Sequence, residues 1–100
     1  MGFLSRLFGL GESKDYKELI DQGARIIDVR TPQEFAMGHA KGSVNIPLQQ
    51  FGQSVKKIKK KDTDVILCCK SGMRASQARQ MLKGSSFNVY NAGSWKKVNY

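Results

Sequence analysis

The chain has 100 residues, of which 40% are apolar, and it carries a formal net charge of +9 at pH 7. This length supplies one hydrophobic core and excludes two independently folded domains. The positive charge predicts attraction to anions, either nucleic acid or small anionic substrates, although an ordinary solvated surface explains most of the lysines and we expect no nucleic-acid partner.

An apolar arm, residues 1–12, precedes a predicted domain at residues 13–100. Its large apolar side chains would share one face of a helix: Phe3, Leu4, Leu7 and Phe8. The arm is too short to span a membrane and does not resemble a signal peptide. Contact with a membrane surface or a partner stays open, but we favour an arm that packs on its own domain or frays.

Short apolar runs alternate with helical patterns through the rest of the chain. Ser13 is the expected cap of a first helix that Gly23 ends, and further helices are expected after Thr31, from 48 and over about 74–83. The expected strands are 24–29, 43–46, 65–68 and 87–90. This alternation predicts a single α/β domain with a mainly parallel central sheet and helices on both faces. Ligands of such sheets bind at the carboxyl ends of the strands.

Several polar residues in the first half are ambiguous. Asp28 and Arg30 fall on one side of a strand. They could lie near a binding loop and act there, or they could form a structural ion pair or cap neighbouring turns, which we favour. Glu34 follows Thr31 by three residues, which is a capping box and favours a structural role. His39 lies in a turn, where a histidine usually bonds backbone groups, so we do not expect it to act as a general base.

Five lysines gather at the end of the helix that begins at 48: Lys56, Lys57, Lys59, Lys60 and Lys61. They complement the helix dipole, or they form a basic patch for nucleic acid or an acidic partner protein. No aromatic residues interleave with them, as single-strand binding would require, and we favour a solvated face.

The chain is organised around the stretch from Val65 to Arg74, where an apolar strand runs into the cysteines and a short loop follows. The next residues, 75–82, are predicted to form a helix. The first turn of a helix has free N–H groups and a positive dipole end, which attract an anion. A thiolate held there is a nucleophile. Lys70 and Arg74 add positive charge on both sides of the loop.

The two cysteines give two spacings. Cys68 to Arg74 is C-x5-R, as in tyrosine phosphatases, and Cys69 to Arg74 is C-x4-R. Because neighbouring side chains of a strand point to opposite faces, only the last strand residue reaches the loop, which favours Cys69 as the nucleophile and Cys68 as a core residue. No histidine precedes either cysteine, as the phosphatase pattern usually requires.

The cysteine count also bears on location and metals. Two adjacent cysteines do not make a disulfide framework, so we expect a reducing, cytoplasmic compartment. They and a lone His39 are not a usual ligand set, and we expect neither a metal nor another cofactor.

Three blocks of the chain resemble the rhodaneses, in particular the single-domain sulfurtransferases. Residues 69–74, CKSGMR, are similar to their six-residue active-site loop, and Ser76 follows as in many members. Residues 27–35 and 38–47 resemble the family's "DVR…EF…GHI.GA.NIP" pattern, with Ala40 in place of isoleucine. Residues 91–95, NAGSW, are similar to its closing segment, with Ala92 where a second glycine is common.

The resemblance implies a single rhodanese-like domain in which Cys69 accepts sulfur from an anionic donor such as thiosulfate, a persulfide or a polysulfide. The Cys69 persulfide would pass that sulfur to cyanide, a small thiol or a sulfur-carrier protein. The resemblance also implies that Asp28 and Arg30 have a scaffold role. The loop residues would bind the substrate: Lys70, Ser71, Gly72, Met73 and Arg74.

Two other functions stay open. A phosphatase or arsenate reductase would use Cys68 or Cys69 with Arg74, although the loop counted from Cys69 is one residue shorter than the phosphatase pattern. A non-enzymatic adaptor would dock through its basic helix, and the intact cysteine argues against a purely structural domain.

Overall fold

The computed structural model describes residues 15–100, and their strands form a sheet in the order β2-β1-β3-β4 in which every pairing is parallel. The strands are β1 (Arg25–Asp28), β2 (Val44–Asn45), β3 (Val65–Cys69) and β4 (Val89–Ser94). The helices are α2 (Tyr16–Asp21), α3 (Pro32–Ala36), α4 (Leu48–Lys60), α5 (Met73–Met81) and the 3-10 helix η1 (Trp95–Val98). The predicted α/β class with a parallel sheet is confirmed.

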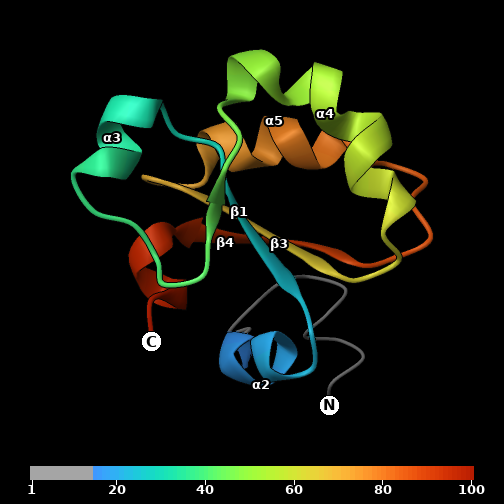
Figure 1. The fold of residues 1–100 in the computed structure, drawn as a ribbon, viewed down its shortest axis with the longest axis horizontal. Helices are drawn as coiled ribbons and strands as arrows, with labels where there is room; N and C mark the ends of the chain where they lie inside the picture. The colour runs from blue at the N-terminus through green and yellow to red at the C-terminus, as the bar shows by residue number, and fades with distance from the viewer. Residues whose placement is uncertain (1–14) are drawn as a thin grey trace.

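Helices cover both faces of the sheet, as predicted: α4 and α5 lie on one face, and α2 and η1 lie on the other (Figure 1). The two faces have separate cores because side chains alternate along each strand. Phe51 of α4 and Ala78 of α5 pack with Leu67 of β3, whereas Val98 of η1 packs with Ile66 on the opposite face.

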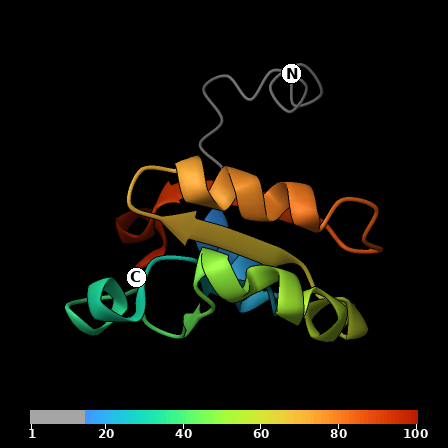
Figure 2. The same cartoon turned by 90° about the horizontal axis from the view of Figure 1, so that it is seen from above.

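Strand β3 is one of the two inner strands of the sheet, and all five of its residues are buried. A near-continuous apolar run is what a parallel strand covered on both faces requires. The strand extends one residue beyond the predicted 65–68, so that Cys69 is its last residue. Its carboxyl end points toward the end of the molecule that carries α3 (Figures 1 and 2).

Helices α2 and α3 begin at side-chain caps. Thr31 and Glu34 form the predicted capping box at α3, with Pro32 as the first helical residue. The cap of α2 differs from the prediction. Asp15, and not Ser13, accepts a hydrogen bond from the Glu18 N–H, because the helix begins at Tyr16 and the capping residue must directly precede it.

Arg25 of β1 caps the other end of α4. Its guanidinium donates to the carbonyls of Ile58 at 3.0 Å, Lys61 at 3.1 Å and Thr63 at 2.7 Å. It also lies over the ring of Phe87, 5.1 Å from the ring centre. Ile58 lies in the last turn of α4, Lys61 is its C-cap residue and Thr63 follows in the next turn. A helix end leaves its last carbonyls without partners inside the helix, so the partly buried Arg25 supplies a cap for α4 and for the turn after it.

The last strand was mispredicted. Strand β4 runs over Val89–Ser94 and not over 87–90, and it therefore includes most of the glycine-containing closing segment. The β-branched and aromatic residues of β4 end at Tyr90, so strand propensity gave no signal for residues 91–94. Pairing with β3 overrides it: Asn91 aligns with Leu67 and Gly93 with Cys68, with a register shift between them at Ala92.

Smaller differences concern element ends. Helix α5 spans Met73–Met81, and β2 is only two residues long. No helix within residues 15–100 is long and apolar enough to cross a membrane. The predicted apolar arm, residues 1–12, lies outside the described residues, and its boundary stays a prediction.

Candidate active site

Cys69 lies where β3 ends and the predicted loop begins. Its side chain is buried, at 1% exposure, on the face that α4 and α5 cover. The backbone N–H of Gly72 donates a hydrogen bond to the Cys69 Sγ, with the two atoms 2.9 Å apart. Because Gly72 is the N-cap of α5, the sulfur lies at the positive end of that helix. This arrangement stabilises negative charge on the sulfur.

Gly72 is the residue that turns the loop back toward the sulfur. Its φ of +111° lies in the left-handed region, which disfavours side chains, and a Cβ at this position would lie 3.3 Å from the Gly93 Cα. Asn91 of β4 fixes the turn: its Nδ2 donates to the Gly72 carbonyl and its Oδ1 accepts from the Gly93 N–H, both at 2.9 Å. The Gly72 N–H is therefore held in place from β4.

Arg74 does not point freely into the loop, because Glu34 of α3 binds it. Two guanidinium nitrogens donate to the two carboxylate oxygens at 2.7 Å and 3.1 Å. The hydrogen bond from Arg74 lowers the pKa of Glu34 to about 2, and the Thr31 backbone N–H contributes to the same shift. Glu34 thus connects the cap of α3 to Arg74, at the end of the loop that follows Cys69.

The remaining loop residues line the outer side of the site. Lys70 and Ser71 are exposed, and Met73 is 75% exposed at the first turn of α5. Gly72 therefore contacts the sulfur and Arg74 is bound to α3, whereas the side chains of Lys70, Ser71 and Met73 face solvent.

Cys68 points to the opposite face of the sheet, as strand alternation predicts. It is fully buried with Ile66 and Val98. Burial raises the pKa of its thiol to about 12, and the nearby negative charge of Asp28 adds to this effect. Cys68 is therefore a neutral core residue at physiological pH.

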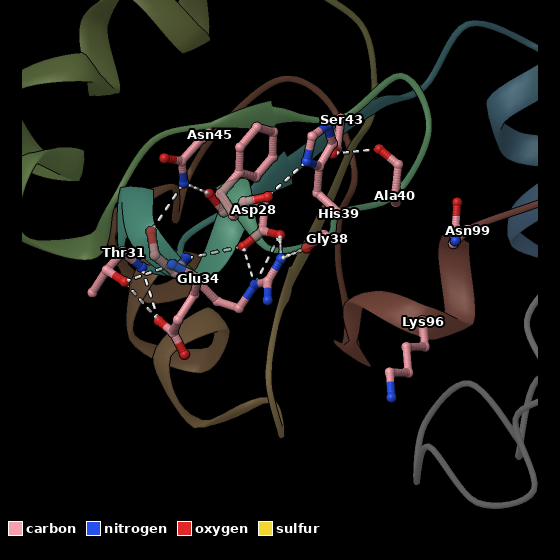
Figure 3. Close-up of polar contacts among 12 residues, drawn as sticks. Asp28, Thr31, Glu34, Gly38, His39, Ala40, Ser43, Asn45, Lys96 and Asn99 are labelled. Carbon is pink, nitrogen blue, oxygen red and sulfur yellow. Dashed lines mark hydrogen bonds and ion pairs between the residues drawn. The ribbon is translucent and has the colours of Figure 1, made fainter.

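Asp28 and Arg30 form the structural ion pair of the first half (Figure 3). Their closest atoms, the Arg30 Nη2 and the Asp28 Oδ2, are 2.8 Å apart, and both side chains are buried. The Arg30 Nη2 also donates to the Gly38 carbonyl at 2.7 Å. His39 bonds the Phe35 carbonyl through its Nδ1 at 2.7 Å, as expected for a histidine in this turn.

Two contacts of the site were not predicted from the sequence: the Asn91 clamp on Gly72 and the Glu34–Arg74 pair. A usable signal existed for the first, because the carboxyl ends of neighbouring parallel strands meet at one edge and Asn91 belongs to the strand beside β3. Among residues 15–100, no group of three or more His, Cys, Asp or Glu side chains is placed to hold a metal ion.

The α/β domain that carries this cysteine also matches a known protein family. The family model of the rhodanese-like domain matches residues 12–99. The chain belongs to the rhodanese-like domain family. The predicted family and fold are thereby confirmed.

Named relatives and solved structures agree with this assignment. The chain is 42% identical over 76 residues to the uncharacterized protein YqhL of Bacillus subtilis, matching 74% of this chain and 60% of that protein. It is 31% identical to the thiosulfate sulfurtransferase PspE of Escherichia coli, covering 72% and 71% of the two chains. A solved rhodanese with anions from E. coli superposes with a TM-score of 0.66 at 28% identity, covering 76% of this chain and 92% of its own.

Proposed function

We propose that this rhodanese-like domain is a sulfurtransferase in which Cys69 carries sulfane sulfur as a persulfide. The observation that supports it most strongly is the 2.9 Å hydrogen bond from the Gly72 N–H to the Cys69 Sγ at the start of α5. Rhodanese sulfurtransferases in general use thiosulfate as donor and thiols as acceptors, and the relative PspE is named for that activity. The two free, buried thiols suit a reducing compartment, and we propose a cytoplasmic location.

In the first step the Cys69 thiolate attacks the outer sulfur of thiosulfate. A new S–S bond forms at Cys69, the S–S bond of thiosulfate breaks, and sulfite leaves with the electron pair. The Gly72 N–H and the helix end stabilise the thiolate before attack. Lys70, exposed beside the loop, attracts the anionic donor.

In the second step an acceptor thiolate, or cyanide, attacks the outer sulfur of the Cys69 persulfide. The acceptor gains that sulfur, and Cys69 leaves as a thiolate, which the same N–H stabilises. Backbone N–H groups of the loop would bind the negative outer sulfur of the intermediate. Glu34 would keep Arg74 from folding over the loop, and thus keep the entrance open.

The phosphatase alternative is not supported by the position of Cys68. The C-x5-R spacing requires Cys68 to face the loop, whereas its side chain is packed on the opposite face of the sheet. Its raised pKa of about 12 also leaves it a poor nucleophile at neutral pH.

Mass spectrometry of the intact protein after brief exposure to thiosulfate tests the proposal. The wild type and Cys68→Ala should each gain one sulfur atom, and Cys69→Ala should gain none. Cyanide should then remove the added sulfur as thiocyanate.

The outcomes separate the alternatives. Loss of the adduct in Cys68→Ala alone would contradict the assignment of Cys69 and reopen the phosphatase spacing. No adduct in any form, also with a polysulfide as donor, would leave the adaptor as the better explanation.

A further inference from the structure

Stabilisation of the C-terminal end of α4 does not explain why so many lysines lie there. A helix end is stabilised by cations near its last carbonyls, but the Arg25 guanidinium already donates to three carbonyls at that end. Lys59 contacts the end of α5 instead, because its Nζ donates a hydrogen bond to the Lys83 carbonyl at 3.4 Å. This contact also places the C-terminal ends of α4 and α5 side by side.

Five exposed lysines remain at these two helix ends, and we call them the lysine patch: Lys56, Lys57, Lys60, Lys61 and Lys83. None of them forms an ion pair within residues 15–100. The nearest acidic residues along the chain, Asp62 and Asp64, accept hydrogen bonds from Ser86 and Asn88. Asp62 and Asp64 are the only acidic residues between positions 35 and 100, so two carboxylates face the five lysines of the patch and the face keeps an excess of positive charge.

Helix α5 connects the lysine patch to the candidate active site. It begins at the loop that holds Cys69 and ends beside the patch, and α4 lies alongside it (Figure 2). Nine residues of α-helix are about 13 Å long, at about 1.5 Å per residue. The helix carries Arg74 and Arg79 but no acidic residue. A partner lying along α5 would therefore reach both the sulfur and the patch.

We propose that the α4–α5 face docks an acidic segment of a protein whose cysteine accepts sulfur from Cys69. This inference rests on the proposed function and names its acceptor class. Charge complementarity supports an acidic partner. A protein is favoured over nucleic acid because the patch contains no aromatic side chains for base stacking.

Two cysteine peptides measure this docking directly. Each has an N-terminally acetylated cysteine, a spacer of four glycines and serines, and then six residues that are all glutamate or all glutamine. The extended spacer spans about 13 Å, at about 3.3 Å per residue, which matches the length of α5. The readout is kcat/KM for discharge of the Cys69 persulfide by each peptide, with cyanide as the small acceptor.

We expect the wild-type protein to prefer the glutamate peptide by about tenfold or more, and this preference should vanish between about 0.05 M and about 0.5 M salt because the contacts are exposed ion pairs. Lys57→Glu/Lys60→Glu should abolish the preference and leave discharge by cyanide unchanged. The matched control, Lys17→Glu/Lys97→Glu, changes the net charge equally on the opposite face and should keep the preference.

Several results would overturn the proposal. Equal rates for the two peptides would show that no acidic segment docks, and an equal loss in both double variants would show that only net charge matters. Competition by a uridine oligonucleotide at lower concentration than the glutamate peptide would assign the face to nucleic acid. Because cyanide discharge is recorded for every variant, a failure of docking is distinguished from a failure of sulfur transfer.

Discussion

Cys68 and Cys69 are adjacent on one strand, yet they lie in opposite chemical environments. The Cys69 sulfur receives a backbone N–H at a helix N-terminus, which stabilises negative charge. The Cys68 thiol is fully buried beside Asp28, which keeps it neutral and raises its pKa to about 12. The comparison teaches that the face of the sheet, and not the residue type, separates a candidate nucleophile from a core residue.

The two arginine–carboxylate pairs, Asp28–Arg30 and Glu34–Arg74, also differ in burial between the Cys68 side and the Cys69 loop. The Asp28–Arg30 pair on the Cys68 side has side-chain exposures of 0% and 7%, whereas Glu34 and Arg74 are 34% and 32% exposed. Buried pairs are costly to break, and exposed pairs contribute little. One region is therefore expected to govern stability and the other the position of the loop.

The largest expected effect breaks the buried pair. Asp28→Asn leaves the Arg30 charge buried without its carboxylate, which costs about 3–5 kcal/mol of unfolding free energy. Urea denaturation measures this loss of unfolding free energy. Glu34→Gln is the comparison, and we expect it to lose about 1 kcal/mol. A loss below about 1 kcal/mol for Asp28→Asn would show that the two pairs are equivalent.

The second prediction compares the two thiols directly. With a pKa of about 12, only about one Cys68 in ten thousand is ionised at pH 8, and thiolates are the reactive form. We expect iodoacetamide to label Cys68 at least about a hundredfold more slowly than Cys69, as measured by peptide mapping. In urea both sites should label at similar rates, and equal labelling of the folded protein would contradict the assignment of the two faces.

The third prediction concerns the clamp on the loop. Asn91→Ala removes the hydrogen bonds to Gly72 and Gly93 and should lower the rate of persulfide formation by about tenfold. Removal of an N–H donor from a site costs about a hundredfold or more, and we expect a smaller loss here because the Gly72 N–H would be displaced and not removed. Two lost hydrogen bonds should also lower the unfolding free energy by about 1–2 kcal/mol.

The matched control for the clamp is Asn88→Ala, at the other end of β4, where the side chain bonds Asp64. It should lower stability slightly and leave the rate unchanged. An equal loss of rate in both variants would show that β4, rather than the clamp, is what the site requires.

The smallest expected effect is the pH dependence of the partly exposed Glu34–Arg74 pair. The pKa of Glu34 lies near 2 in the folded protein, against 4.5 as its ordinary value, so its contribution is present above pH 4.5 and is lost as the pH falls toward 2. The difference in unfolding free energy between wild type and Glu34→Gln should be constant from pH 5 to 7 and shrink below pH 4.5. A difference that persists unchanged at pH 2 would contradict the pairing with Arg74.

Local signals predicted much of the fold. Alternating apolar runs predicted the parallel sheet, and Thr31 with Glu34 predicted the start of α3. Strand alternation predicted that Cys68 belongs to the core. Each of these follows from residues that are close in sequence, where periodicity and capping rules operate.

The remainder depends on contacts between distant residues. Glu34 and Arg74 are 40 residues apart, and nothing in either segment indicates that α3 lies beside the loop. The extent of β4 is determined by its pairing with β3, which local propensity does not encode. From the sequence, the lysines of α4 are sufficient to complement the helix dipole at its C-terminal end. The contact of Arg25 with that end comes from β1, which is distant in sequence.

The Arg25 cap also bears on how the chain folds. Because Arg25 lies in β1 and reaches carbonyls 33 to 38 residues later, the last turn of α4 gains its cap only after β1 has taken its place. Strand β1 likewise pairs with β3 across about forty residues, and within residues 15–100 every strand pair is parallel and none is joined by a local hairpin. We therefore expect α4 and the sheet to form in one cooperative step, at a rate limited by long-range loop closure.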